Sequence, residues 1–167
     1  INLFQNRNFK LFKIMSQVAN ENNQTVYAVG GYVRDLLMKR KAPTDIDFVT
    51  EQSGIDLAQK IAHSINPKTK VSVFKTYGTA MFRYEDLELE FVGARKESYS
   101  EDSRKPAVET GSLEDDQKRR DFTINAMAIS LNKDTFGELI DPFNGQSDLQ
   151  NKILRTPLEP HQTYSDD

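Results

Sequence analysis

The stretch that decides the fold reads VGGYVRDLL at residues 29–37, MKRKAPT at 38–44 and DIDFV at 45–49. The β-branched and aromatic run over 25–29 predicts a buried strand, which the glycine pair Gly30-Gly31 ends. Apolar residues at helical spacing predict a helix over 32–38. A basic turn containing Pro43 follows, and 46–50 predicts a second strand. The two halves together predict one site, with a glycine turn at one end and a carboxylate pair at the other.

The carboxylate pair is formed by Asp45 and Asp47. Residues two apart on a strand point the same way, so both carboxylates face one side while Ile46 and Phe48 face the core. Converging carboxylates repel each other unless a cation lies between them. Mg²⁺ takes oxygen ligands and commonly uses one or two carboxylates together with substrate phosphates. On spacing alone, an ordinary polar strand face with both Asp side chains in water is favoured.

The glycine pair has a functional and a structural interpretation. Glycine lets the backbone approach a ligand closely, and free N–H groups at a helix N-terminus attract phosphate. Arg34 lies one turn into the helix, where a guanidinium could hold a phosphate oxygen. The alternative is a tight strand-to-helix turn in which Arg34 pairs with Asp35 or is solvated. The longer spacing of a P-loop, with its Lys-Ser/Thr, is not present.

A second acidic pair, Glu88 and Glu90, lies on a later predicted strand whose apolar residues alternate with it. If the sheet places this strand beside Asp47, Glu90 could complete a three-carboxylate cluster, with Glu88 further along. The alternative is a solvent-facing edge strand protected by charge. The sequence leaves these two interpretations nearly balanced.

A basic cluster, Lys118-Arg119-Arg120, directly precedes Asp121 and a predicted helix over 121–129. Cations at a helix N-terminus oppose the helix dipole, so a bound phosphate would relieve the conflict. Asp121 is a natural N-cap for that helix. The alternative is a solvated charge run.

The remaining periodicities predict an α+β fold with a mixed sheet. We expect a helix over 8–21, a helix capped by Ser53, strands over 71–75, 79–84 and 87–94 joined as hairpins, a long charged loop over 95–120, a short strand over 137–140 and a helix over 147–153.

Composition narrows the class of protein. The 167 residues carry 22 Lys and Arg against 25 Asp and Glu, a net charge of −3, which argues against a generally basic nucleic-acid coat. The absence of Cys excludes disulfides and thiolate metal sites. No apolar run approaches the roughly 20 residues of a membrane span, so we expect no membrane contact and a cytoplasmic protein. His63 and His161 have no partners at metal-ligand spacing. The ends, Ile1 and Asp167, suggest a fragment of a longer chain.

Several linked motifs resemble class II template-independent nucleotidyltransferases, the bacterial CCA-adding enzymes and related poly(A) polymerases. The resemblance covers most of the chain from about residue 26. It is carried by GGYVRD at 30–35, DIDF at 45–48, LEDDQKRRDFTINA at 113–126, IDPFNG at 140–145 and Asp148-Leu149. The family's Pro-Leu-Arg motif and its later base-reading Glu-Asp-x-x-Arg motif would lie beyond Asp167.

This resemblance implies a polymerase-beta-like head with a largely antiparallel mixed sheet flanked by helices. It implies an N-terminal helix over 1–24, a head over 25–155, and the start of a linker to a helical neck over 156–167.

The reaction that the resemblance implies is transfer of CMP and AMP from CTP and ATP to the tRNA 3′ end, with two Mg²⁺ ions and release of pyrophosphate. Alternatives are poly(A) or partial addition, nucleotidylation of a small molecule, a non-catalytic nucleotide- or RNA-binding module, and a structural domain. The implied metal ligands are Asp45, Asp47 and, less directly, Glu90; the implied nucleotide-binding residues are Gly30, Gly31, Arg34, Arg119, Arg120 and Asp121.

Overall fold

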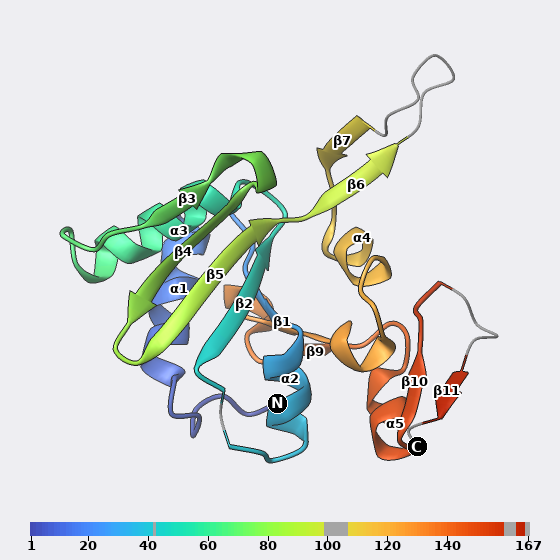
Figure 1. Cartoon of the computed structure of the whole chain (residues 1–167). Helices are drawn as coiled ribbons and strands as arrows, with labels where there is room; N and C mark the ends of the chain where they lie inside the picture. Colours follow the sequence, from blue (N-terminus) through green and yellow to red (C-terminus); the bar gives the residue numbers. More distant parts are fainter. Residues whose placement is uncertain (42, 99–106, 159–162, 166–167) are drawn as a thin grey trace.

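A seven-stranded mixed sheet is the main element of the computed structural model, which describes residues 1–41, 43–98, 107–158 and 163–165 (Figure 1). In spatial order its strands are β3 (Ser72–Phe74), β4 (Thr79–Tyr84), β5 (Leu87–Gly93), β2 (Asp45–Thr50), β1 (Tyr27–Val29), β8 (Ala128–Ser130) and β9 (Leu139–Ile140). The β2–β5 pair is parallel and the other neighbouring pairs are antiparallel. The predicted α+β class and the predicted hairpins β3–β4 and β4–β5 are confirmed.

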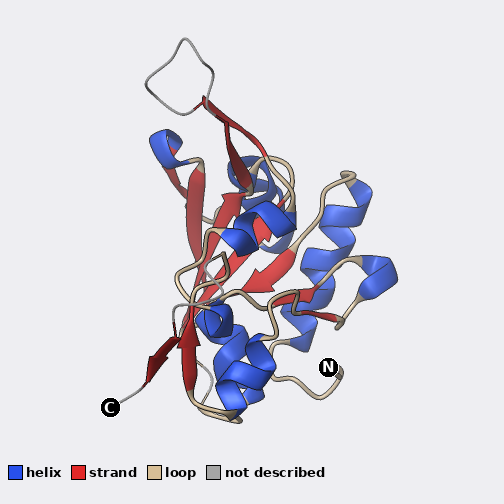
Figure 2. Cartoon of the chain, turned by 90° about the vertical axis from the view of Figure 1, so that its right-hand side faces the viewer, coloured by secondary structure: helices blue, strands red, loops and turns tan. Residues whose placement is uncertain are grey.

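Two amphipathic helices, α1 (Phe9–Glu21) and α3 (Gly54–Ile65), cover one face of the sheet (Figures 1 and 2). The predicted cap of α3 is present, since the Ser53 hydroxyl accepts the N–H of Asp56. Aromatic rings join helix and sheet: Phe12 meets Phe48 edge-on at 6.3 Å, and Phe48 stacks on Phe91 at 4.9 Å between ring centroids. Since this face of β2 and β5 is apolar and buried, the alternate residues of both strands point away from α1 and α3.

Shorter helices lie to one side of the sheet, where α2 contacts the interior strands β1 and β2. They are α2 (Gly31–Leu37), α4 (Leu113–Lys118), the 3₁₀ turn η2 (Thr123–Asn125) and α5 (Gly145–Gln150). Figure 1 shows α4 and α5 to the right of the sheet, and Figure 2 views them from that side. α5 contacts η2, and η2 contacts α2, so three segments far apart in sequence are held together.

The predicted long loop over 95–120 is wrong. Strands β6 (Arg95–Ser98) and β7 (Ala107–Thr110) pair antiparallel as an arm beyond β5 (Figure 1), and α4 follows; residues 99–106 lie outside the described part. A capping box begins the short helix α4, with Ser112 and Asp115 each accepting the other's backbone N–H. Reciprocal side-chain bonds of this kind stabilise a helix whose apolar content is too low to predict it.

The predicted helix over 121–129 is also wrong. The chain makes only the single turn η2 and then enters β8, whose three residues are buried beside β1. Part of the apolar, Ala-containing run that predicted a helix is a strand instead, because β8 is paired between β1 and β9. Asp121 consequently caps no α-helix; its carboxylate accepts the N–H of Phe122.

Near the C-terminal end of the chain, β10 (Ile153–Arg155) pairs antiparallel with β11 (Thr163–Ser165). Two further 3₁₀ turns are η1 (Lys75–Tyr77) and η3 (Lys133–Thr135). Within the described ranges, no helix is both long and apolar enough to cross a membrane.

Candidate active site

The acidic side chains converge where β2 and β5 run parallel. The register pairs Asp45 with Glu88 and Asp47 with Glu90, so the strand carrying Glu90 lies directly beside Asp47, as one interpretation of the sequence required. Ile46 is fully buried, whereas Asp45 and Asp47 are exposed on the opposite face of β2. The predicted orientation of the carboxylate pair is therefore confirmed.

The electrostatics show that this acidic group is crowded. Loss of hydration raises the pKa of Asp47 although the side chain is solvent-accessible; the Arg120 guanidinium opposes this shift and the Asp45 charge adds to it. Loss of hydration, followed by the charge of Asp47, also raises the pKa of Glu90. The site therefore has an excess of negative charge that a bound cation would neutralise.

The glycine turn lies against these acids because β1 pairs antiparallel with β2, which places Val29 opposite Asp47. Gly30 follows with φ +75°, a conformation that favours glycine. A methyl group added at Gly30 would lie 3.4 Å from Nη1 of Arg120 and 3.8 Å from Oδ2 of Asp47. The carboxylates, the turn and Arg120, separated by up to 90 residues in sequence, thus form one cluster.

Arg34 makes the ion pair that the structural alternative predicted and a second contact that the sequence did not. Its Nε donates to Asp35 at 3.1 Å, and its Nη1 donates to Oδ1 of Asn125 at 2.8 Å. The third nitrogen, Nη2, would lie 3.2 Å from a methyl group at Gly31. Asn125 in turn donates Nδ2–H to Asp121 at 3.1 Å. Asn125, which sequence reasoning missed, therefore joins Arg34 to Asp121.

Arg120, just beyond the C-cap of α4, is held by an acid in that helix. Its Nε and Nη2 both lie 3.1 Å from Oδ2 of Asp116, one turn earlier. Both side chains are mostly buried, with 24% of Arg120 and 14% of Asp116 exposed. Sequence reasoning missed Asp116, although its spacing of four residues from Arg120 on a helix was a usable signal.

The basic cluster lies at the C-terminal end of α4, so the argument from an unfavourable helix dipole is wrong. Lys118 occupies the last turn of α4 and Arg119 is its C-cap, where cations are favoured. Arg119 is exposed, and only Arg120 of the two arginines is placed against the glycine turn.

Helix α4 is anchored by residues to which the sequence analysis assigned no role of their own. The Leu113 N–H donates to Oε2 of Glu51 at 2.9 Å, just beyond β2. The buried Gln117 donates Nε2–H to the carbonyls of Ala126 at 2.9 Å and Ile140 at 3.1 Å. These bonds fix the position of α4, which Arg120 follows. The Gln117 amide is buried, so water cannot replace its protein partners.

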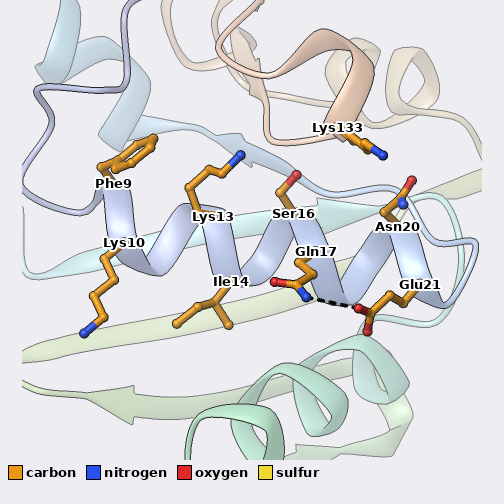
Figure 3. A pocket seen from close by; sticks show the side chains of 9 residues that line it. All are labelled: Phe9, Lys10, Lys13, Ile14, Ser16, Gln17, Asn20, Glu21 and Lys133. Carbon is orange, nitrogen blue, oxygen red and sulfur yellow. Dashed lines mark hydrogen bonds between the residues drawn. The ribbon is translucent and has the colours of Figure 1, made fainter.

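A wide groove of about 610 Å³ runs along α1, but it lacks the chemistry of the acidic site (Figure 3). Its charged lining residues are Lys10, Lys13, Glu21 and Lys133. Lys13 lies 5.2 Å from the ring centroid of Phe136, and Gln17 donates to Glu21. The lining of this groove therefore has no pair of carboxylates like the one at Asp45 and Asp47.

Metal binding requires more than the protein's own side chains. Within the described ranges, no group of three or more His, Cys, Asp and Glu side chains is arranged to hold a metal ion. The carboxylates of Asp45 and Asp47 nevertheless suit Mg²⁺. This ion is commonly bound by one or two protein carboxylates when substrate phosphates supply further oxygen ligands. The role of Glu90 as a third ligand stays a prediction.

Comparison with known proteins identifies the family. The model of the poly A polymerase head domain matches residues 26–155. The chain belongs to this family. Its poly A polymerase head is 47% identical over 131 residues to the A-adding tRNA nucleotidyltransferase of Aquifex aeolicus, covering 77% of the chain and 15% of that relative. It is 36% identical over 164 residues to the A-adding tRNA nucleotidyltransferase of Halalkalibacterium halodurans, covering 97% of the chain and 37% of that relative.

A solved tRNA nucleotidyltransferase, complexed with a primer tRNA and an incoming ATP analog, matches the head in three dimensions. The TM-score is 0.73 at 40% identity, over 86% of this chain and 38% of that one. The chain thus spans well under half the length of these relatives, and the match confirms the expected head fold.

Proposed function

We propose that this head domain carries the catalytic site of a tRNA nucleotidyltransferase, which adds CMP and AMP from CTP and ATP to the tRNA 3′ end and releases pyrophosphate. The observation that carries the proposal is the cluster of Asp45, Asp47, the Gly30 turn and Arg120. Relatives that are 36% to 47% identical to this chain are named A-adding and CCA-adding enzymes, which supports the proposed substrate class.

The chain's own residues would bind and orient the nucleotide. The Gly30-Gly31 backbone would lie against the triphosphate, since a side chain at either position would meet an arginine. Arg34 and Arg120 would donate hydrogen bonds to phosphate oxygens from either side of this turn. Arg119 and Asp121 are proposed to lie at the nucleotide's edge, because both are exposed beside Arg120. Fixing the triphosphate in this way aligns the α-phosphate for in-line attack.

Asp45 and Asp47 would hold Mg²⁺, with Glu90 as the proposed third carboxylate. When bound, a pair of such ions stabilises the attacking and leaving oxygens of a phosphoryl displacement. Loss of hydration, together with the charges of neighbouring carboxylates, raises the pKa values of Asp47 and Glu90, and a cation at this position would neutralise the repulsion between these groups.

The test uses the full-length protein and tRNA that lacks its CCA end, with labelled CTP and ATP. Asp45→Ala and Asp47→Ala are each expected to abolish incorporation while circular dichroism and the melting temperature remain near wild type. Asp134→Ala, on the exposed turn η3, is the matched control and should incorporate normally. Activity retained in both site variants would exclude their metal role.

Sequencing the extended RNA separates the related activities. Addition of CCA, of A alone, or of a poly(A) run would each come from the same cluster with different nucleotide selection. Pyrophosphate release without RNA would instead indicate transfer to a small molecule, and nucleotide binding without release would indicate a binding module.

A further inference from the structure

Arg34 in α2 and Arg120, just beyond the C-cap of α4, are held in a similar way. In each guanidinium, two nitrogens are occupied by neighbouring oxygen atoms and the third faces a glycine of the turn. For Arg34 the partners are Asp35 and Asn125, and Nη2 faces Gly31. For Arg120 the partner is Asp116, whose Oδ2 contacts both Nε and Nη2. The remaining nitrogen, Nη1, faces Gly30.

We infer that Asn125 and Asp116 are positioning residues, which aim one nitrogen of each arginine at the Gly30-Gly31 turn. The inference rests on the proposed function, in which that turn receives the triphosphate. A guanidinium on a long side chain has many rotamers, and ordering one costs conformational entropy when a ligand binds. Two fixed donors per arginine remove this freedom beforehand, so the remaining nitrogen is already directed at the ligand.

Asn125 carries the more specific part of the inference because its amide has two different partners. Its Oδ1 accepts from Arg34 and its Nδ2 donates to Asp121, which uses both ends of the amide. A carboxylate at position 125 would still accept from Arg34 but would repel Asp121. A hydrophobic side chain would do neither. Asn125 therefore couples the arginine on α2 to the segment between α4 and η2.

The turn η2, which carries Asn125, is itself held in place by α5. The hydroxyl of Thr123 donates to the buried carboxylate of Asp148 at 2.6 Å, and a methyl group at Gly145 would clash with the Thr123 carbonyl. Asp141 accepts the N–H groups of Gly145 and Gln146 and so begins α5. The motif at 140–149 thus supports η2, the turn that carries Asn125.

Steady-state kinetics of the full-length protein with Mg²⁺, ATP, CTP and tRNA test the inference. Asn125→Ala and Asp116→Ala are expected to raise the KM for nucleotide about tenfold, with a smaller change in kcat and an unchanged KM for tRNA. Asn125→Asp, which keeps the acceptor for Arg34, should recover part of the nucleotide affinity. Asn151→Ala, on the exposed end of α5, is the control and should match wild type.

A double-mutant cycle separates positioning from general loss of structure. Once Arg34→Ala has removed the arginine, adding Asn125→Ala should raise the KM for nucleotide no further. Additive effects, equal rises in the KM for nucleotide and tRNA, or an unchanged KM in Asn125→Ala would each overturn the inference. A wild-type protein that transfers no nucleotide would instead refute the proposed function, so the two failures are distinguishable.

Discussion

Asp47 and Glu90 lie opposite each other on the parallel strands β2 and β5, and the charge of Asp47 adds to the loss of hydration that raises the pKa of Glu90. Two neighbouring carboxylates repel each other when both are ionised, so protonation of one of them is favoured. At a pH where both groups would ionise, their repulsion therefore destabilises the metal-free site. A bound cation would relieve this repulsion.

Removing one of these charges should stabilise the metal-free protein at neutral pH. Since the pKa of Glu90 is raised in the fold, the folded state binds more protons, and stability falls as pH rises from the ordinary carboxyl pKa through the raised value. Glu90→Gln is expected to melt higher than wild type at pH 7 without Mg²⁺, and the difference should vanish below the ordinary carboxyl pKa.

Thermal melts across pH, with and without Mg²⁺, measure this effect. Glu85→Gln, in the exposed β4–β5 turn, is the control and should follow wild type. A lower melting temperature for Glu90→Gln at pH 7 without Mg²⁺ would contradict the prediction.

Gly30→Ala should lose both stability and nucleotide binding. The positive φ costs a side chain roughly 1 kcal/mol, and the added methyl group would meet Arg120 Nη1 at 3.4 Å. Gly78→Ala is the control for nucleotide binding: Gly78 also has a positive φ, +63°, but nothing lies within 4 Å of an added methyl group, and its ψ of 29° is the left-handed helical region, in which a side chain costs less than at Gly30, whose ψ is −144°. Urea unfolding should show a loss in both variants, whereas nucleotide titration should show a loss only in Gly30→Ala. Equal nucleotide affinity in the two variants would show that the close approach is unimportant.

Thr123→Val should destabilise the support beneath η2. The substitution keeps the shape but removes the hydroxyl that donates to buried Asp148, and an unsatisfied buried acceptor costs about 1–3 kcal/mol. Arg155, 3.7 Å from the same carboxylate, would retain part of the pairing. Thr110→Val, at an exposed position, should change the unfolding free energy little. A loss for Thr123→Val no larger than for Thr110→Val would exclude this role.

Asp115→Asn should weaken the start of α4 in a pH-dependent way. Hydrogen bonding from Ser112 lowers the pKa of Asp115, so the ionised group stabilises the fold above the ordinary carboxyl pKa, and this contribution is lost as pH falls through the lowered value. The group is exposed, so the effect is expected at a few tenths of a kcal/mol, as for other exposed caps and charges. Glu114→Gln, in the same helical turn but outside the capping box, is the comparison in denaturant unfolding. A deficit for Asp115→Asn that is independent of pH would contradict this account.

Much of the fold follows from local patterns. The alternation of Leu87, Leu89 and Phe91 predicts a strand with one buried face, and all three residues are buried in β5. The predictions failed between residues 95 and 129, where the helix α4 is begun by a capping box and the strand β8 is defined by its neighbours. Those elements depend on reciprocal or long-range pairing, which periodicity does not report.

By itself the sequence determined that Asp45 and Asp47 share a face, because side chains on a strand alternate with a period of two. It also determined the glycine turn, because backbone conformations with positive φ favour glycine. Only the tertiary structure decided that β5 lies parallel to β2, that Arg120 reaches Gly30, and that Asn125 meets Arg34. These contacts join residues 43 to 91 positions apart, and their geometry is set by sheet order and helix packing rather than by any local preference.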